Sequence, residues 1–194
     1  MTGLFFGSFN PIHTGHLIMA EYMINHAALD EVWFIVSPQN PLKEQPVLVK
    51  EDLRLQMVKL AVKDNKKFVA NDTEFKLPKP SYTINTLEVL SKKYPKKKFA
   101  LIMGADTLES LNRWKDYQKI LNGYPILVFR RGFINEGEWK QHPGVIFFDT
   151  PLLKISSTLI RTMNEDKKSI RYLVPEKVRE FIQKKRLYLK KKNK

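Results

Sequence analysis

The chain has 194 residues, of which 43% are hydrophobic and 28% charged, so it can form one domain with a core of its own. It has no cysteine, which excludes a disulfide framework, a thiol nucleophile and any metal site with cysteine ligands. Its net charge of +14 suits an enzyme with polyphosphate substrates, because a positive cleft concentrates them, but charge alone does not identify a ligand.

Segments typical of strands alternate with segments typical of helices along the chain. Apolar runs of strand length occur at 3–6, 31–37, 68–70, 99–103, 126–129 and 145–148. Helices are expected at 16–29, 50–62, 83–91, 157–163 and 176–185, and the apolar stripe of the second should be Leu53, Met57, Leu60 and Ala61. Strands separated by helices favour right-handed crossovers. The predicted fold class is therefore α/β: a Rossmann-like, doubly wound, mainly parallel sheet with helices on both faces and a small helical C-terminal extension.

The two ends of the chain bear on its organisation and location. We expect one domain over residues 1–194, with a helical C-terminal part at about 152–188 and a basic tail at 189–194. Residues 184–194 contain seven Lys or Arg and no acid, which is typical of a solvated helix end or of a nonspecific contact with RNA or another polyanion. The first apolar stretch, 4–6, is too short for a signal peptide or a membrane span, so we expect a cytoplasmic protein.

The segment after the first predicted strand has the features of a phosphate-binding loop. It reads Gly7-Ser8-Phe9-Asn10-Pro11-Ile12-His13-Thr14-Gly15-His16. Gly7 lets the backbone come close to a ligand, and the following helix start offers unpaired N–H groups. His13 and His16 can both donate to one phosphate, as phosphoryl transfer requires. Two alternatives are structural histidines and a pair of metal ligands, although no carboxylate or third ligand lies nearby in the sequence.

A second candidate phosphate site lies much later in the chain, at Ile155-Ser156-Ser157-Thr158-Leu159-Ile160-Arg161. Three hydroxyl residues begin a helix, and Arg161 follows one turn later on the same face. Helix capping alone would explain the hydroxyls. Together with a guanidinium that can bind phosphate with two hydrogen bonds, they favour a second anion site.

Both motifs resemble signatures of the nucleotidyltransferase superfamily that carries the HxGH motif. Further segments resemble its bacterial nicotinate-nucleotide adenylyltransferase family, namely 37–43, 80–83, 104–114, 130–132 and 172–188. The sequence departs from the family pattern at three places. Phe6 replaces the first Gly of a usual pair, Leu42 replaces a His, and no Pro follows Arg131.

The resemblance implies roles for particular residues. The catalytic residues would be His13, His16 and Arg161. The residues that bind ATP would be Gly7, Ser8, Phe9, Gly104, Asp106, Ser156, Ser157 and Thr158. The residues that bind the acceptor nucleotide would be Lys43, Tyr82, Thr83, Trp114, Lys115 and Arg130. Thr83 would cap a helix whose N–H groups bind a carboxylate, and Trp114 would stack on a pyridine ring, although Asp106, Trp114 and Lys43 could also be a helix cap, a core residue and a solvated lysine.

The implied activity is transfer of an adenylyl group from ATP to nicotinate mononucleotide, which gives nicotinate adenine dinucleotide and pyrophosphate in NAD biosynthesis. Mg²⁺ would arrive with ATP, because no carboxylate cluster for a metal is apparent. ATP and nicotinate mononucleotide would be the partners, without a membrane or a specific nucleic acid, and a homo-oligomer stays open. The alternatives are another nucleotidyltransferase, such as pantetheine-phosphate adenylyltransferase, and a noncatalytic basic RNA-binding module. A cytidylyltransferase would show a different second motif.

Overall fold

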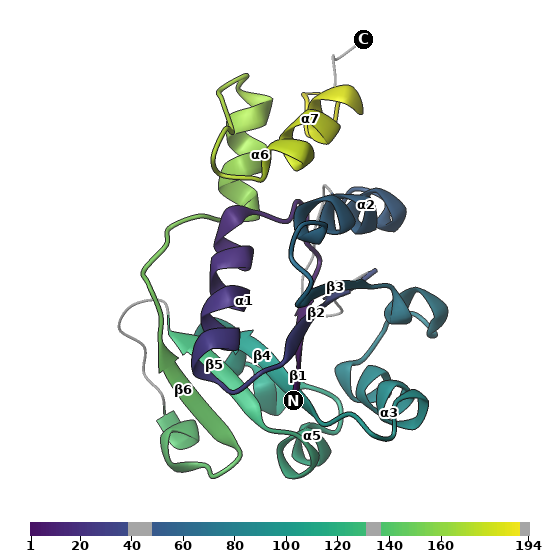
Figure 1. Ribbon diagram of the computed structural model, residues 1–194, viewed down its shortest axis with the longest axis vertical. Helices are drawn as coiled ribbons and strands as arrows, with labels where there is room; N and C mark the ends of the chain where they lie inside the picture. The colour runs from purple at the N-terminus through teal and green to yellow at the C-terminus, as the bar shows by residue number, and fades with distance from the viewer. Residues whose placement is uncertain (39–47, 131–136, 191–194) are drawn as a thin grey trace.

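A six-stranded parallel sheet forms the centre of the computed structural model, which describes residues 1–38, 48–130 and 137–190 (Figure 1). The strands are β1 (Thr2–Gly7), β2 (Glu31–Val36), β3 (Phe68–Asn71), β4 (Phe99–Gly104), β5 (Ile126–Arg130) and β6 (Val145–Asp149). Their order is β3-β2-β1-β4-β5-β6, and every neighbouring pair is parallel. The strand order reverses between β1 and β4, where doubly wound sheets bind ligands. The predicted fold class is confirmed.

Alternate residues of the inner strands face opposite sides of the sheet, and each side has its own core. Leu4 and Phe5 of β1 belong to different cores, and Trp33 and Phe34 of β2 divide in the same way. Because both faces are covered, the inner strands are apolar along nearly their whole length. This is why continuous apolar runs, rather than alternating ones, identified them in the sequence.

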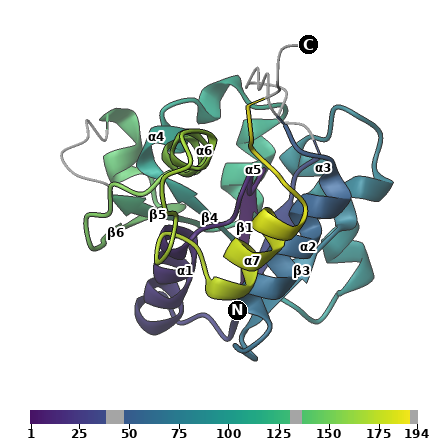
Figure 2. The ribbon, with the colours of Figure 1, turned by 90° about the horizontal axis from the view of Figure 1, so that it is seen from above.

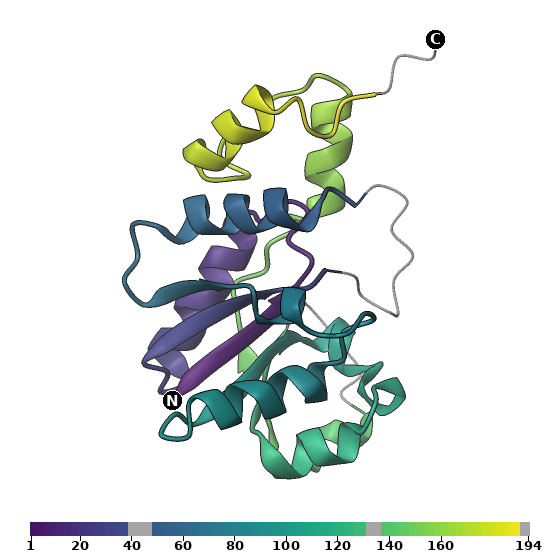
Figure 3. The ribbon, with the colours of Figure 1, turned by 90° about the vertical axis from the view of Figure 1, so that its right-hand side faces the viewer.

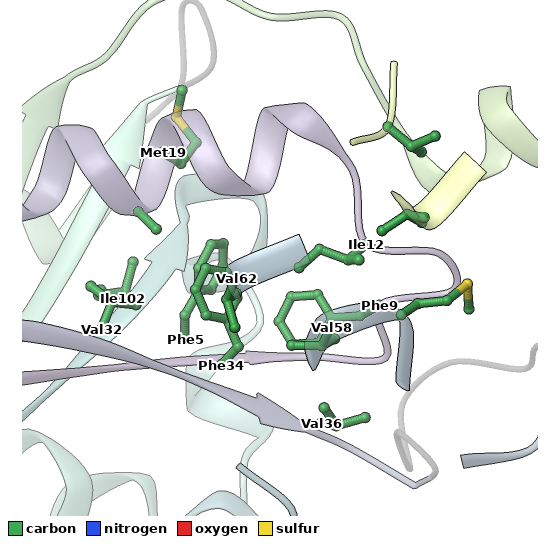
Figure 4. Close-up of a cluster of buried hydrophobic side chains, with 14 of the residues drawn as sticks. Phe5, Phe9, Ile12, Met19, Val32, Phe34, Val36, Val58, Val62 and Ile102 are labelled. Carbon is green, nitrogen blue, oxygen red and sulfur yellow. The ribbon is translucent and has the colours of Figure 1, made fainter. Parts of the chain in front are cut away.

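Helices cover both faces of the sheet, as Figure 3 shows with α2 and α3 on opposite sides. The core around Phe5 and Phe34 is shared by α1 (Thr14–His26), α2 (Glu51–Val62), α6 (Ser157–Glu165) and α7 (Glu176–Lys184). The core around Leu4 and Trp33 is shared by α3 (Thr83–Lys93), α4 (Ala105–Leu108) and α5 (Tyr117–Gly123). Short 3₁₀ helices lie at η1 (Thr73–Lys76), η2 (Leu111–Arg113) and η3 (Gly137–Gln141). Figure 4 shows part of the first core, in which Val62 lies near Phe5 and Phe34, and Val58 lies near Phe9.

The buried face of α2 differs from the predicted one. Of the four stripe residues only Met57 is fully buried, and the other residues of the buried face are Arg54, Leu55, Val58 and Val62. An arginine occupies a core position here, with no exposed surface. Leu60 and Ala61 of the predicted stripe are partly buried against the same core, so the prediction was right in part. It missed Arg54 because an apolar pattern cannot register a buried charge.

Other differences concern the ends of helices and the short elements. α1 begins at Thr14 rather than at His16, with His13 as its N-cap residue. The N-cap residue of α3 is Tyr82, and Thr83 is the first helical residue, so the predicted capping role of Thr83 was wrong. α4 and α5 were not predicted, because elements this short hold too few residues for a periodic pattern.

The C-terminal helices return to the carboxyl ends of the strands. α6 begins beside the start of α1, and α7 packs on α2 (Figures 1 and 2). The segment between them is fastened to α1, because the Thr14 N–H donates to the Leu173 carbonyl at 2.9 Å. This arrangement brings the second predicted motif next to the first.

Candidate active site

A cavity of about 1130 Å³ opens at the carboxyl ends of β1 and β4. A cavity of this size can hold more than one nucleotide-sized ligand. The structure gathers most of the predicted site residues in its lining, which includes Gly7, Ser8, Phe9, His13, His16, Gly104, Asp106, Trp114, Ser156, Ser157, Thr158 and Arg161. The two motifs therefore face one common space.

The two histidines form a stacked pair at the start of α1. Their ring centroids are 3.6 Å apart, and His13 is almost completely buried. The His13 N–H donates to Nδ1 of His16 at 3.2 Å, as the N-cap N–H does to the acid of a capping box. Because Nδ1 accepts this bond, a neutral His16 ring carries its proton on Nε2. The N–H donor of a neutral His16 ring therefore lies on the side of the ring away from the His13 N–H.

Two glycines end the central strands where the backbone needs space. A Cβ on Gly7 would lie 2.9 Å from the Phe9 ring, and a Cβ on Gly104 would lie 2.3 Å from Oδ1 of Asp106. Both distances are too short for any other residue to be accommodated without movement of these groups. The close packing places Phe9 and Asp106 directly over the ends of β1 and β4.

The second motif is bonded to the first across a long sequence separation. Ser156 is the N-cap residue of α6 and accepts the Leu159 N–H at 3.1 Å. The Ser157 hydroxyl donates to the Pro11 carbonyl at 2.8 Å, and Nη1 of Arg161 donates to the Asn10 carbonyl at 2.9 Å. The start of α6 and the loop after β1 thus form one hydrogen-bonded unit that faces the cavity.

Of the described residues predicted to bind the acceptor nucleotide, Trp114 alone lies in the cavity lining. Trp114 lines the cavity and is half-buried. Nζ of Lys115 lies 4.9 Å from the centroid of the Tyr82 ring, a cation–π distance, so these two residues are neighbours at the start of α3. Tyr82, Thr83 and Lys115 are not part of the cavity lining.

Arg130 is not part of the cavity lining, and Lys43 lies outside the described residues. Nη1 of Arg130 donates to Oδ1 of Asp149 at 2.7 Å, and its guanidinium lies over the Phe147 ring. These partners belong to the edge strand β6. Arg130 follows Phe129, which lines the cavity and pairs with Gly104, but Arg130 itself is not part of the lining.

Glu74 is a buried carboxyl that sequence reasoning missed. Its oxygens accept from the Ser81 and Thr86 hydroxyls, both at 2.9 Å, and from the Ser37 hydroxyl. It therefore joins the end of β2 to the segment before α3 and to α3 itself. Burial raises the pKa of the Glu74 carboxyl, and the three hydroxyl donors oppose this rise. No sequence signal marks it, because its partners are set only by the fold.

We expect Glu74→Gln to change how stability depends on pH. A raised pKa in the folded state means that Glu74 stabilises the fold fully below its unfolded pKa of about 4.5, and that this contribution is lost as pH rises through the folded pKa. The free energy of unfolding of the wild type should therefore fall relative to that of Glu74→Gln as pH rises above about 4.5. Urea unfolding at a series of pH values measures this difference. Glu88→Gln, at an exposed position of α3, controls for the lost charge, and a difference that rises with pH would contradict the expectation.

The C-terminal segment supplies two further cavity residues, Tyr188 and Leu189. The Tyr188 hydroxyl donates to Oδ1 of Asn10 at 2.8 Å, and Nδ2 of Asn164 donates to the Leu187 carbonyl at 2.9 Å. Burial raises the pKa of the Tyr188 hydroxyl. Their position near the chain end, just before a lysine run, gave no sign of this placement.

Truncation should separate the tail from this segment. Deletion of 190–194 should leave kcat and KM within about twofold, since Lys190 makes only an exposed pair with Asp166 at 3.8 Å. Deletion of 187–194 removes the cavity residues Tyr188 and Leu189 and the hydrogen bonds of Leu187 and Tyr188, and should raise KM for ATP about tenfold or more. Steady-state kinetics of the two truncated proteins measure the effect. Loss of most activity in the shorter deletion would mean that the tail belongs to the site or to an assembly interface.

Comparisons with known proteins agree with one another. The family model described as cytidylyltransferase-like matches residues 4–163. A relative from Cytophaga hutchinsonii, named as a probable nicotinate-nucleotide adenylyltransferase, is 47% identical and covers 96% of this chain and 97% of its own length. One of the same name from Flavobacterium johnsoniae is 46% identical, with 97% and 98% covered. The nicotinic acid mononucleotide adenylyltransferase of Plasmodium falciparum, solved as a complex with NaAD, is similar in fold with a TM-score of 0.80 over 96% of each chain at 20% identity.

Proposed function

We propose a mechanism for a chain that belongs to the nicotinate-nucleotide adenylyltransferases, within the cytidylyltransferase-like family. The protein transfers the adenylyl group of ATP to nicotinate mononucleotide, which gives nicotinate adenine dinucleotide and pyrophosphate in NAD biosynthesis. One observation carries the assignment of roles. His13, His16, Ser157 and Arg161 come from two motifs far apart in the sequence and line the same cavity.

The reaction is a direct in-line displacement at the α-phosphorus of ATP. A 5′-phosphate oxygen of the mononucleotide forms the new bond, the bond to the oxygen that bridges to the β-phosphate breaks, and pyrophosphate leaves with its electron pair. The protein contributes positioning and charge stabilisation, and no side chain becomes covalently modified. His13 and His16 stabilise the charge on the transferring phosphate, while Ser157 and Arg161 hold the leaving pyrophosphate. Both latter side chains now bond loop carbonyls, and each has further donor or acceptor capacity for a phosphate.

Mg²⁺ enters this scheme as part of the substrate, bound to ATP. Within the described ranges, no group of three His, Asp or Glu side chains is arranged to hold a metal ion. The carboxylates in the cavity lining are Asp106 and Glu165. They fit an ion whose ligands are mainly phosphate oxygens and water, completed by one or two carboxylates.

The described part of the chain has no helix long and apolar enough to cross a membrane. The cytoplasmic location and the absence of a specific nucleic-acid partner stay predictions from the sequence, and so does the division of the chain into one domain with a basic tail.

Pyrophosphate release tests the function. The purified protein is given Mg-ATP with nicotinate mononucleotide, nicotinamide mononucleotide or phosphopantetheine as the acceptor. We expect rapid release with nicotinate mononucleotide, slower release with the amide and none with phosphopantetheine. Release with phosphopantetheine alone would assign the chain to the pantetheine-phosphate adenylyltransferases. If none of the three acceptors gave pyrophosphate release, adenylyl transfer to a small molecule would be overturned.

A further inference from the structure

The side chain of Arg54, on α2, is completely buried and is bound by main-chain carbonyls. Nη1 donates to the carbonyls of Ser8 and Ser37, both at 2.6 Å, Nη2 donates to Pro38 at 2.8 Å, and Nε donates to Val49 at 2.9 Å. No ion pair among the described residues includes it. Burial lowers the pKa of Arg54, as expected for a cation without a paired anion.

This guanidinium joins three segments at the carboxyl edge of the sheet. Ser8 lies in the loop after β1, Ser37 and Pro38 follow β2, and Val49 precedes α2. Burying an unpaired cation costs several kcal/mol before its hydrogen bonds are counted, and a hydrophobic residue would fill the position at a lower cost.

The bond to Ser8 sets the direction of the next N–H. The Ser8–Phe9 peptide is trans, so the Phe9 N–H points away from the Ser8 carbonyl and hence away from Arg54. Ser8 and Phe9 line the cavity, whereas Arg54 does not. Among the hydrogen bonds of the described residues, none uses the Phe9 N–H. The N–H is therefore directed to the cavity side as a donor for a ligand.

Phe9 needs such support because its backbone is strained. Its φ is 45°, in the left-handed region that a bulky residue adopts only at an energetic cost. Its ring is held on the other side, with centroids 5.7 Å from Phe34 and 5.1 Å from His16. Arg54 thus holds the peptide group that precedes Phe9, and the Phe34 and His16 rings hold its side chain.

We propose that Arg54 is a positioning residue for adenylyl transfer. By holding the Ser8 carbonyl it aims the Phe9 N–H at a phosphate of ATP, and its unpaired charge raises the positive potential beneath the phosphates. The inference rests on the proposed function for the identity of the phosphate ligand. Lys at this position would keep the charge but could not form the planar fork of four bonds.

Kinetics of Arg54→Lys test the role. We expect the protein to fold and kcat/KM for ATP to fall about tenfold to a hundredfold, because a small misplacement of a donor is that costly, while KM for nicotinate mononucleotide changes less than about threefold. Arg54→Met, which also removes the charge, should lose more. Lys59→Met removes a charge from the exposed face of the same helix and should match the wild type. Wild-type kcat/KM in folded Arg54→Lys would overturn the proposal.

A spectroscopic readout separates loss of positioning from loss of the fold, because the spectrum of each variant also shows whether that variant is folded. Ser8-Phe9 is the only Ser-Phe pair in the sequence, so labelling with ¹³C-carbonyl serine and ¹⁵N-phenylalanine gives a single two-residue correlation that reports the Phe9 N–H. Inorganic triphosphate should shift this peak in the wild type and in Lys59→Met, and should shift it much less in Arg54→Lys. No shift in the wild type would overturn the proposal. A shift without pyrophosphate release from any acceptor would instead overturn the function and leave the positioning of a phosphate donor intact.

Discussion

Replacing His16 with alanine is expected to lower kcat about a hundredfold or more, the scale seen when one donor to a developing charge is removed. The expected loss follows from the tautomer of His16. Nδ1 accepts the His13 N–H, so Nε2 carries the proton that the transferring phosphate can receive as a hydrogen bond. Alanine removes this donor and also the stacking partner of His13. KM for ATP should change less than kcat, because the donor acts mainly on the transition state.

The variant should still fold, with a modest loss of stability. The lost cap bond is worth about 1 kcal/mol, and the half-buried His16 ring also contacts Phe9. His26→Ala is the matched control, since His26 lies at the exposed end of the same helix and outside the cavity lining. Circular dichroism and pyrophosphate release on both variants decide the matter. A folded His16→Ala protein with near-normal turnover would refute the role of this residue.

The parts of the fold that depend on the apolar pattern and on local turn and helix-capping residues were predictable. All six strands were expected within one or two residues of their observed ends. Both motifs were expected at the junction of a strand or loop with a helix, where they lie. Such features follow from short stretches of chain, because the faces of an inner strand are both buried and a helix start requires capping and N–H groups wherever it occurs.

The groups that escaped prediction are polar residues whose partners lie far away in the sequence. Arg54 interrupts the apolar stripe of α2 and is satisfied by carbonyls of three other segments. Glu74 is satisfied by hydroxyls that the fold brings to it. Tyr188 reaches back to Asn10 across most of the chain. Periodicity measures where apolar residues recur. It therefore predicts that every charged residue is exposed, and only the tertiary contacts reveal one that is buried.

The family resemblance predicted a set of acceptor-binding residues, and only some of them lie in or next to the cavity lining. Trp114 lines the cavity. Lys115, the next residue, contacts the ring of Tyr82 at the start of α3, although the two residues are far apart in the sequence. Arg130 instead pairs with Asp149 on the edge strand. The acceptor site is therefore the least complete part of the described geometry, and substrate choice is the property that tests it most directly.

Nicotinate mononucleotide should be preferred over the nicotinamide form by about tenfold to a hundredfold in kcat/KM. The two differ by a carboxylate in place of a neutral amide, and N–H groups at the start of α3, with the nearby Lys115 ammonium, can donate to both carboxylate oxygens. The amide offers an NH₂ donor to one of these donors, and a mispaired buried donor costs about 1–3 kcal/mol. Steady-state kinetics with the two mononucleotides measure the ratio, and equal use of both would refute this site.

Trp114→Ala should raise KM for nicotinate mononucleotide about tenfold, because stacking on an aromatic face is worth about 1–3 kcal/mol per ring. KM for ATP should change much less, since the proposed stack involves the pyridine ring alone. Trp114→Phe keeps an aromatic face and should recover most of the loss, as expected if stacking is responsible for it. The acid-to-amide ratio should stay nearly constant in both variants, because the indole does not contact the group by which the substrates differ. A Trp114→Ala effect confined to ATP would move the adenine to this wall of the cavity and require a different acceptor site, while adenylyl transfer itself would stand.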